Sequence, residues 1–326
     1  GAREELPEEI RKRKFNKVLV VTDKALFECG VTARVTEVLD RAGIAYEVYS
    51  EVKPNPTIKN VLDGVQACKN AGADVIVAVG GGSSIDTAKG ISIVMTNPDR
   101  ADIVSLNGAS NTENRGMPII ALPTTSGTAA EVTINYVITD EEREIKMVCV
   151  DPNDIPILAI VDSDLMASMP KSIASATGMD ALTHAVEGYI TKAHNTMSDM
   201  FHMQAIKLIF KYLPAAVNEK DEKAVEMMGL AQYIAGMGFS NVGLGIVHSM
   251  AHQLGAVYDT PHGLANAILL PTVMRFNGED PATAQRFREI LCEIGRPDAA
   301  NLNDQDVINT FVWMISELSK SVGITQ

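Results

Sequence analysis

The 326-residue sequence has few basic residues for its number of acidic ones. Lys and Arg together number 28 and Asp and Glu 41, which gives a formal net charge of −13. Proteins that bind nucleic acid or anionic membranes do so through clustered Lys and Arg. The charge balance therefore predicts that neither nucleic acid nor a membrane is a partner of this chain. Its 46% apolar and 21% charged residues are typical of a globular protein.

Cysteine is also scarce, and the four cysteines (Cys29, Cys68, Cys149 and Cys292) are widely separated with no C-x-x-C pair. This spacing argues against a disulfide framework and against a thiolate zinc site. We expect small buried hydrophobic side chains in a reducing compartment, and hence a cytoplasmic protein. No apolar run approaches the ~18 residues of a membrane span, and the charged N-terminus has no signal-peptide pattern.

What the first half does contain is an alternation of short β-branched runs with helical stretches. This is typical of a parallel sheet covered by helices on both faces. The expected strands are residues 17–21, 45–49, 75–79, 119–122 and 157–161. Helices are expected up to about Ala42 and over residues 58–71. Residues 132–139 and 146–150 flank the charged stretch 140–144 and predict a hairpin.

After about Asp164 the sequence changes to helical periodicity with almost no strand signal. Ala, Met and Leu recur at three- and four-residue spacing over residues 174–189, 198–212 and 224–236. Gly-rich segments at residues 236–245 and near Gly263 are expected to separate these helices. We therefore predict two domains, an α/β domain over residues 1–164 and an all-helical domain over residues 165–326.

Two polar loops of the first half follow expected strands. Gly80–Asp86, with the sequence G-G-G-S-S-I-D, precedes a helix expected near Ser84. Its glycines would let backbone N–H groups approach a pyrophosphate, and the helix N-terminus adds a favourable dipole. Because the spacing is not G-x-G-x-x-G, a tight turn without ligand is the alternative. The second loop, Pro123–Thr128, is expected to begin a helix at residues 129–131, and two such loops favour a nucleotide site.

Asp23 stands at the end of the first expected strand. A carboxylate there can accept hydrogen bonds from both ribose hydroxyls of an adenosine, and it would repel a 2′-phosphate. This position therefore predicts NAD(H) in preference to NADP(H). Capping of the following helix would account for a single Asp equally well.

Only six histidines are present, and four of them lie near one aspartate in the second half. Asp180 and His184 are four residues apart, so they share one helix face. His248 and His252 repeat this spacing, and His262 follows. One carboxylate with several imidazoles suits a divalent transition metal such as Fe(II), Zn, Ni or Mn. We interpret the other two histidines, His194 and His202, as ordinary residues.

Together these motifs resemble those of the iron-containing (group III) alcohol dehydrogenases. The resemblance rests on four stretches, at residues 80–86, 123–131, 180–189 and 248–266. It covers essentially the whole chain and is strongest for the branch that includes lactaldehyde reductase, 1,3-propanediol dehydrogenase and methanol dehydrogenase. It implies the dehydroquinate-synthase-like architecture, with a nucleotide-binding α/β domain followed by a helical metal-binding domain.

The resemblance also implies roles for individual residues. The metal, usually Fe(II), would be held by Asp180, His184, His248 and His262. The dinucleotide would be bound by Asp23, Asn55, Gly81, Gly82, Asp86, Thr124, Thr125, Thr128 and Lys146. The substrate and nicotinamide pocket would be lined by Asn135, Phe239 and His252. His252 lies one turn from His248 and is the candidate proton relay, with structural support of the metal centre as its rival role.

The implied activity is reversible hydride transfer between NAD(H) and a short-chain primary alcohol or diol, in a homo-oligomer of two or more copies. Ser84-Ile85 and Gln253 depart from the lactaldehyde enzyme, so the substrate stays open. The resemblance further implies that the family's first strand lies before residue 1 and its last helices beyond Gln326. Two alternatives remain, namely a dehydroquinate-synthase-like lyase and an inactive metal- and nucleotide-binding fragment. The region from Asp180 to Gly263 contains five Lys and no Arg, few for a phosphorylated, carboxylated substrate, which disfavours the lyase.

Overall fold

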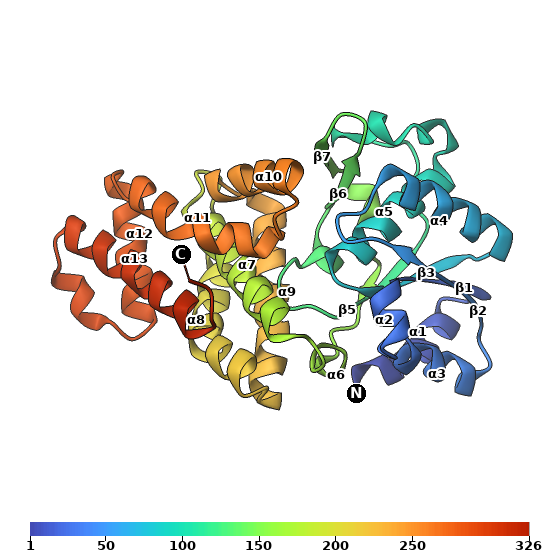
Figure 1. Cartoon of the computed structure of the whole chain (residues 1–326), viewed down its shortest axis with the longest axis horizontal. Helices are drawn as coiled ribbons and strands as arrows, with labels where there is room; N and C mark the ends of the chain where they lie inside the picture. Colours follow the sequence, from blue (N-terminus) through green and yellow to red (C-terminus); the bar gives the residue numbers. More distant parts are fainter. Residues whose placement is uncertain (326) are drawn as a thin grey trace. The chain divides into compact units, whose positions relative to one another are not determined.

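The computed structural model describes residues 1–325, which form two compact units (Figure 1). The first, which we call the α/β unit, comprises Gly1–Thr125 and Ala129–Ser168. The second, which we call the helical unit, comprises Ser126–Thr128 and the chain from Met169 onward. The short loop Ser126–Thr128 therefore belongs to the helical unit, although its neighbours in sequence belong to the α/β unit.

The α/β unit is built on a five-stranded parallel sheet, as the sequence predicts, with the order β2-β1-β3-β5-β8. Its strands are β1 (Lys17–Asp23), β2 (Ala45–Val52), β3 (Val75–Gly80), β5 (Ile119–Pro123) and β8 (Leu158–Ala159). The chain passes from β1 to β2 on one side and then to β3 on the other, so the order reverses between β1 and β3. Open α/β sheets bind ligands in the crevice at such a reversal, beyond the carboxyl ends of the strands.

Helices cover both faces of this sheet, because alternate strand residues point to opposite sides. The helices of the unit are α1 (Leu6–Lys12), α2 (Lys24–Glu28), α3 (Ala33–Ala42), α4 (Ile58–Ala71), α5 (Gly82–Thr96) and α6 (Ser163–Met166). Leu19 and Ile76 are buried in one core with residues of α4 and α5. Val18 and Val77 are buried in a second core with residues of α1 and α3. The predicted covering on both faces is confirmed.

The predicted hairpin is also confirmed, since β6 (Asn135–Asp140) and β7 (Ile145–Val150) pair antiparallel, with β4 (Gly108–Ala109) beside β7. Three local predictions were wrong. The helix expected up to Ala42 is two helices, α2 and α3, interrupted at Gly30 with a φ of +82°. The strand at 157–161 is reduced to two residues. The helix expected at 129–131 is one 3₁₀ turn, because β-branched residues then lead into β6.

In the helical unit, all regular elements of the described residues are helices, as predicted. They are α7 (Lys171–Ile190), α8 (Thr196–Asn218), α9 (Glu222–Val242), α10 (Ile246–Tyr258), α11 (His262–Asn277), α12 (Pro281–Glu293) and α13 (Asp304–Ser321). Helix α7 packs against α8, α9 and α11 (Figure 1). Its residues from Gly178 to Tyr189 are all buried, so polar side chains in this stretch lie inside the unit.

The break predicted at residues 236–245 is confirmed only over residues 243–245. Helix α9 continues through Gly236 and Gly238 and ends only at Val242. Gly238 packs directly on the ring of His202, where a Cβ would lie 2.3 Å from Nε2. The glycine is therefore needed for close packing between helices rather than for a turn.

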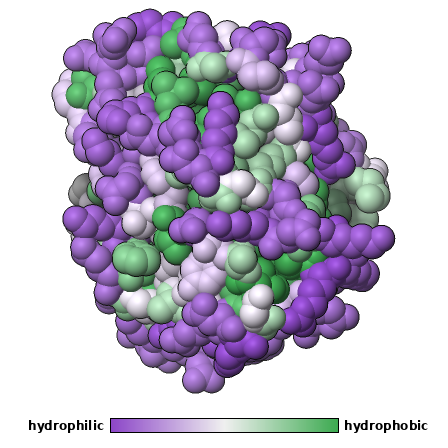
Figure 2. Space-filling model, turned by 90° about the vertical axis from the view of Figure 1, so that its right-hand side faces the viewer, coloured by the Kyte–Doolittle hydropathy of each residue, from purple (hydrophilic) through white to green (hydrophobic). Residues whose placement is uncertain are grey.

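The surface gives two further observations. Hydrophilic residues cover most of the face shown in Figure 2, with smaller hydrophobic areas between them. Cys68 and Cys149 are buried as expected, but Cys29 is exposed and Cys292 partly exposed, so the expectation fails for those two. Among the described residues, no helix is by itself long and apolar enough to cross a membrane; α9 and α10 meet the test only as a pair, bent by 102°.

Candidate functional site

Three neighbouring strands of the parallel sheet end side by side, and predicted cofactor residues follow each end. Strand β1 ends at Asp23, β3 at Gly80 and β5 at Pro123. Gly80 is the register partner of Pro123. Gly81 and Thr124 therefore begin adjacent loops, at the edge of the sheet where the strand order reverses.

The loop after β3 leads directly into α5. Gly81 is the N-cap of this helix, and no side chain caps its first turn, so backbone N–H groups are available to an anion. A Cβ on Gly80 would lie 2.3 Å from Ser84 Oγ, and the φ of Gly80 is +156°. The Thr125 side chain lies over Gly81, where a Cβ would be 3.0 Å away. The two predicted loops therefore meet.

Asp23 caps the short helix α2, accepting a hydrogen bond from the Leu26 backbone N–H at 2.8 Å on Oδ1. The alternative interpretation of this residue as a helix cap is thus confirmed. Capping occupies one carboxylate oxygen and leaves the other for a ribose hydroxyl. Ribose binding by Asp23 stays a prediction.

The remaining predicted cofactor residues lie at several places. Lys146 Nζ on β7 donates to Asn55 Oδ1 at 2.7 Å, so two residues 91 positions apart in sequence are joined. Asp86 Oδ2 accepts from the Val137 backbone N–H at 3.0 Å, which links α5 to β6. Thr128 lies in the helical unit with Ser126–Thr128. The structure brings most of these residues to one end of the sheet, and their binding roles stay predictions.

In the helical unit, three of the four predicted metal ligands meet. One donor atom each from Asp180, His248 and His262 lies within 4.8 Å of the other two. The Asp180 Oδ1 atom is 3.7 Å from His248 Nε2 and 3.6 Å from His262 Nε2. Asp180 and His248 are buried, and His262 is partly exposed. These residues come from α7, α10 and α11, which lie together in Figure 1.

The fourth predicted ligand, His184, lies beside this cluster. Its ring stacks on that of His248 with centroids 4.5 Å apart, and on that of Phe239 at 4.3 Å. His184 Nδ1 is 3.2 Å from the Gly127 carbonyl oxygen. Donation from Nδ1–H to this oxygen leaves the Nε2 lone pair free for a metal. Gly127 packs so closely on Thr177 of α7 that a Cβ would lie 2.6 Å from it.

The electrostatics of the cluster favour a cation. Burial opposes ionisation of Asp180, but the nearby imidazoles of His184, His262 and His248 hold its pKa well below the usual value. Burial lowers the pKa of His184 to about 4. Burial also opposes protonation of His248, but the nearby Asp180 carboxylate and the hydrogen bond to Glu187 raise its pKa to about 9. At neutral pH the cluster thus presents the Asp180 carboxylate beside the neutral His184 imidazole, whereas His248 has to release a proton when it binds a cation.

Two further residues of the cluster were missed by the sequence analysis. Glu187 Oε2 accepts from His248 Nδ1 at 2.6 Å. The Asn266 amide nitrogen lies 2.7 Å from Asp180 Oδ1 and 3.1 Å from His248 Nε2. Glu187 is three residues after His184 and Asn266 four after His262, so helical spacing could have pointed to both.

The three predicted pocket residues lie in both units. Phe239 stacks on His184, and His252 lies one turn after His248 on α10, its ring centroid 5.2 Å from that of His262. Asn135 begins β6 in the α/β unit. A pocket shared by Asn135, Phe239 and His252 stays a prediction.

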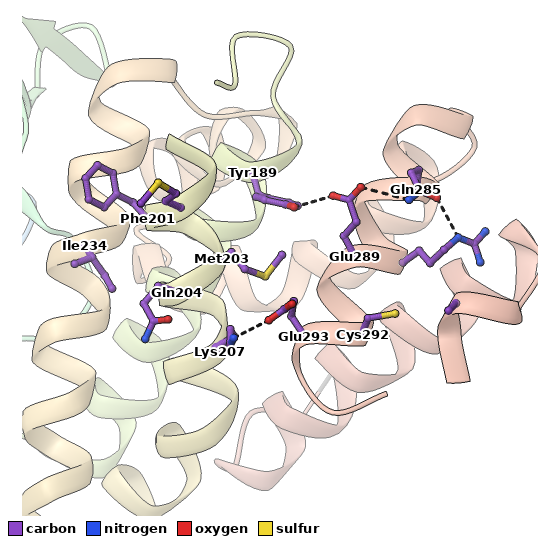
Figure 3. Close-up of a pocket in the computed structure, with 13 residues that line it drawn as sticks. Tyr189, Phe201, Met203, Gln204, Lys207, Ile234, Gln285, Glu289, Cys292 and Glu293 are labelled. Carbon is purple, nitrogen blue, oxygen red and sulfur yellow. Dashed lines mark hydrogen bonds and ion pairs between the residues drawn. The ribbon is translucent and has the colours of Figure 1, made fainter. Parts of the chain in front are cut away.

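A cavity of about 950 Å³ lies elsewhere in the helical unit, among α8, α9 and α12 (Figure 3). The apolar side chains of Phe201, Met203 and Ile234 line it. Polar groups on its wall pair with one another, as Glu289 does with the Tyr189 hydroxyl at 2.8 Å. It contains none of the six histidines, so it supplies no donor set like that of Asp180, His248 and His262.

Comparison with known families gives two matches along the chain. Residues 1–163 match the model "iron-containing alcohol dehydrogenase". Residues 174–326 match the model for the C-terminal part of the "Fe-containing alcohol dehydrogenase family". Both halves of the chain thus point to one family.

Individual relatives agree with these matches. Lactaldehyde reductase of Escherichia coli K12 is 51% identical over 324 residues, which are 99% of this chain and 84% of that protein. A crystal structure of 1,3-propanediol oxidoreductase aligns with a TM-score of 0.94 at 41% identity, covering 99% of this chain and 84% of that one. Sulfoacetaldehyde reductase from Bifidobacterium kashiwanohense, solved in complex with NAD⁺, aligns with a TM-score of 0.88 at 29% identity, covering 100% and 83%.

Proposed function

The chain belongs to the iron-containing alcohol dehydrogenase family, and on that premise we propose that it transfers hydride between NAD(H) and a short-chain primary alcohol or diol. Lactaldehyde/1,2-propanediol and 1,3-propanediol are the first candidates, because relatives named for these compounds are 51% and 42% identical to the chain. The observation that carries the proposal is the buried cluster of Asp180, His248 and His262. The lyase alternative has no support, since both halves match the dehydrogenase family.

The proposed metal is Fe(II), with Zn, Ni or Mn as substitutes. The donor set fits such an ion, because one carboxylate and imidazoles are typical ligands of divalent transition metals. Asn266 Oδ1 is buried without a hydrogen-bond partner among the described residues, and its amide nitrogen lies against Asp180 and two imidazole Nε2 atoms. The proposed ligands are Asp180, His184, His248 and His262.

When bound, the metal would supply Lewis acidity that lowers the pKa of an alcohol and polarises an aldehyde carbonyl. The chain's own residues have other tasks. Phe239 packs on His184 and limits the movement of that ring. We assign His252 as the proton relay, since an imidazole is the side chain most suited to accept and release a proton near neutral pH.

The dinucleotide is proposed to bind at the carboxyl ends of β1, β3 and β5. The uncapped N-terminus of α5 would face its phosphates. Asp23 would accept from the adenosine ribose and disfavour a 2′-phosphate. A cytoplasmic location remains an expectation from the cysteine pattern, and a homo-oligomer remains an expectation from the family resemblance.

The activity itself is tested by loading the purified chain with Fe(II) anaerobically and offering it NAD⁺ with 1,2-propanediol, 1,3-propanediol, methanol or ethanol. We expect NADH to form continuously with at least one diol and to stop when a chelator removes the metal. A lyase would produce no net NADH. A fully metal-loaded protein that forms no NADH from any of these alcohols would contradict the proposal.

The metal site is tested separately by His248→Ala. Removing one of the imidazoles should abolish metal retention through gel filtration, measured by elemental analysis. His194→Ala is the matched control, because His194 is exposed and pairs with Asp199 away from the cluster. Stoichiometric metal in His248→Ala would refute the assignment.

Cofactor preference is tested by Asp23→Asn, which keeps an N-cap acceptor for α2 but removes the negative charge. The ratio of kcat/KM for NAD⁺ over NADP⁺ should fall by roughly tenfold, equal to ~1.4 kcal/mol. Asp221→Asn, at the N-cap of α9, is the control and should leave the ratio unchanged. An unchanged ratio in Asp23→Asn would limit Asp23 to capping.

A further inference from the structure

Glu187 makes an unusual set of contacts for a buried carboxylate. It lies on α7, seven residues after Asp180, and is 1% exposed. Its Oε1 accepts from the Val247 backbone N–H at 2.7 Å. Its Oε2 accepts from His248 Nδ1 at 2.6 Å and lies 3.4 Å from the His248 backbone nitrogen. One side chain of α7 therefore contacts the first turn of α10 three times.

The first of these contacts completes α10. The first N–H groups of a helix have no partner within it and need an acceptor when they are buried. Gly245, the N-cap of α10, provides no side-chain cap, so the Glu187 carboxylate takes this place from another helix. The fit is tight, because a Cβ on Gly245 would lie 2.6 Å from Glu187 Oε1.

The second contact determines which nitrogen of His248 carries the proton. With Nδ1–H donating to Glu187, Nε2 is the nitrogen that faces the cluster, 3.7 Å from Asp180 Oδ1 and 3.1 Å from the Asn266 amide nitrogen, and its lone pair is the one available to a metal once the ring is neutral. Metal-binding histidines commonly have such a carboxylate on their second nitrogen, which sets the tautomer and ring orientation. A carboxylate that also anchors the helix backbone controls the position of the residue as well as its tautomer.

We infer that Glu187 is the positioning residue that holds His248 for metal binding and joins the α7 and α10 parts of the centre. This inference rests on the proposed metal centre, since it concerns a residue that does not itself bind the ion. It assigns a function to Glu187, and to Gly245 the function of leaving room for the Glu187 carboxylate; the sequence predicted neither.

The test measures Zn²⁺ affinity of the whole chain by competition with a chromogenic chelator near neutral pH. Glu187→Gln should bind Zn²⁺ about 10- to 100-fold more weakly, the usual loss when such a carboxylate is replaced. Gly245→Ala retains the Glu187 carboxylate but displaces it, because the new Cβ would lie 2.6 Å from Oε1, so this variant should also bind Zn²⁺ more weakly. Glu289→Gln is the control, because Glu289 pairs with the Tyr189 hydroxyl and does not touch the histidines.

A second readout separates positioning from mere support of α10. ¹⁵N NMR of the metal-free histidines, recorded at a pH high enough for the His248 ring to be neutral, should show His248 protonated on Nδ1 in the wild type, and a mixture of tautomers in Glu187→Gln. Wild-type affinity, or an unchanged tautomer, in a folded Glu187→Gln variant would overturn the inference while leaving the metal centre intact. A wild-type chain that binds no Zn²⁺ would instead overturn the proposed centre, and the inference with it.

Discussion

At the residue scale, His202 is a polar side chain whose burial is not compensated by hydrogen bonds. It is fully buried on α8, and neither ring nitrogen has a hydrogen-bond partner among the described residues. Gly188 of α7 and Gly238 of α9 press on its ring from two helices. Burial lowers its pKa from 6.5 to about 4, with Asp199 raising it and Arg286 lowering it to smaller extents.

This residue predicts acid sensitivity of the helical unit. Between about pH 6.5 and pH 4 the unfolded chain binds a proton at His202 that the folded chain does not, so stability falls as the pH decreases through this range. The difference amounts to about 3 kcal/mol. In His202→Leu this part of the pH dependence should disappear, as measured by urea unfolding at several pH values. His194→Leu, at an exposed position, should keep it; equal slopes for His202→Leu and wild type would contradict the assignment.

The candidate site shows which residues a sequence can reveal at this scale. Asp180 and His184, and likewise His248 and His252, are visible because helical spacing puts each pair on one face. Glu187 also shares the face of Asp180, but a single glutamate on a helix has no distinctive meaning until its partner is known. That partner is the first turn of α10, 60 residues away in sequence. Asn266 is hidden for the same reason.

At the scale of elements, α5 and β6 are joined by a buried polar clamp. Asp86 accepts from the Val137 N–H, and Lys89 Nζ donates to the carbonyl oxygens of Thr133 and Asn135 at 2.6 and 2.9 Å. Lys89 is 0% exposed and lies 3.7 Å from the Asp154 carboxylate. The clamp links the helix after the glycine loop to the strand that begins at Asn135, so it holds two predicted binding segments in one position.

Breaking this clamp on one side should be costly. Lys89→Met leaves Asp154 as a buried, uncompensated carboxylate and should lower the free energy of unfolding by about 3–5 kcal/mol. Adding Asp154→Asn removes that charge and should recover at least ~1 kcal/mol. Lys59→Met, which breaks only the exposed pair with Asp63, should change stability by less than ~1 kcal/mol. Urea unfolding measures these three variants and the single variant Asp154→Asn, and an additive double variant would show that the pair is not coupled.

Elements were predictable where local pattern and tertiary packing agree. The strands β1 and β3 are continuous apolar runs, and α4 has its capping Thr57 and terminal Gly72 in the sequence, so its predicted bounds are confirmed. Prediction failed where packing decides. Gly236 and Gly238 predict a break, yet α9 continues through both, and Gly238 makes room for the His202 ring. The sequence of the loop after β5 predicts the start of a helix. Ala129 instead adopts a φ of +53°, and the chain continues through one 3₁₀ turn into β6.

At the scale of the whole molecule, the two units carry different proposed ligands. The proposed dinucleotide residues lie mainly at the strand ends of the α/β unit, whereas the proposed metal ligands all lie in the helical unit. Each unit buries apolar residues of its own, so local unfolding of one unit need not accompany local unfolding of the other. A ligand stabilises the structure that binds it, by about 2.7 kcal/mol at 100 times its Kd.

Amide hydrogen exchange followed by mass spectrometry can therefore locate each ligand without measuring activity. Zn²⁺ at 100 times its Kd should slow exchange in peptides from α7, α10 and α11 by up to about 100-fold. NAD⁺ should slow exchange in peptides from β1, β3 and α5.

The single tryptophan, Trp313 on α13, gives an independent fluorescence signal from the helical unit. The unfolding midpoint followed by this signal should rise more with Zn²⁺ than with NAD⁺. His248→Ala should abolish the Zn²⁺ effect while leaving the NAD⁺ effect unchanged. Equal protection of both units by Zn²⁺ alone would show that the two units unfold together, as one cooperative unit. The assignment of one ligand to each unit would then rest on the variants at Asp23 and His248.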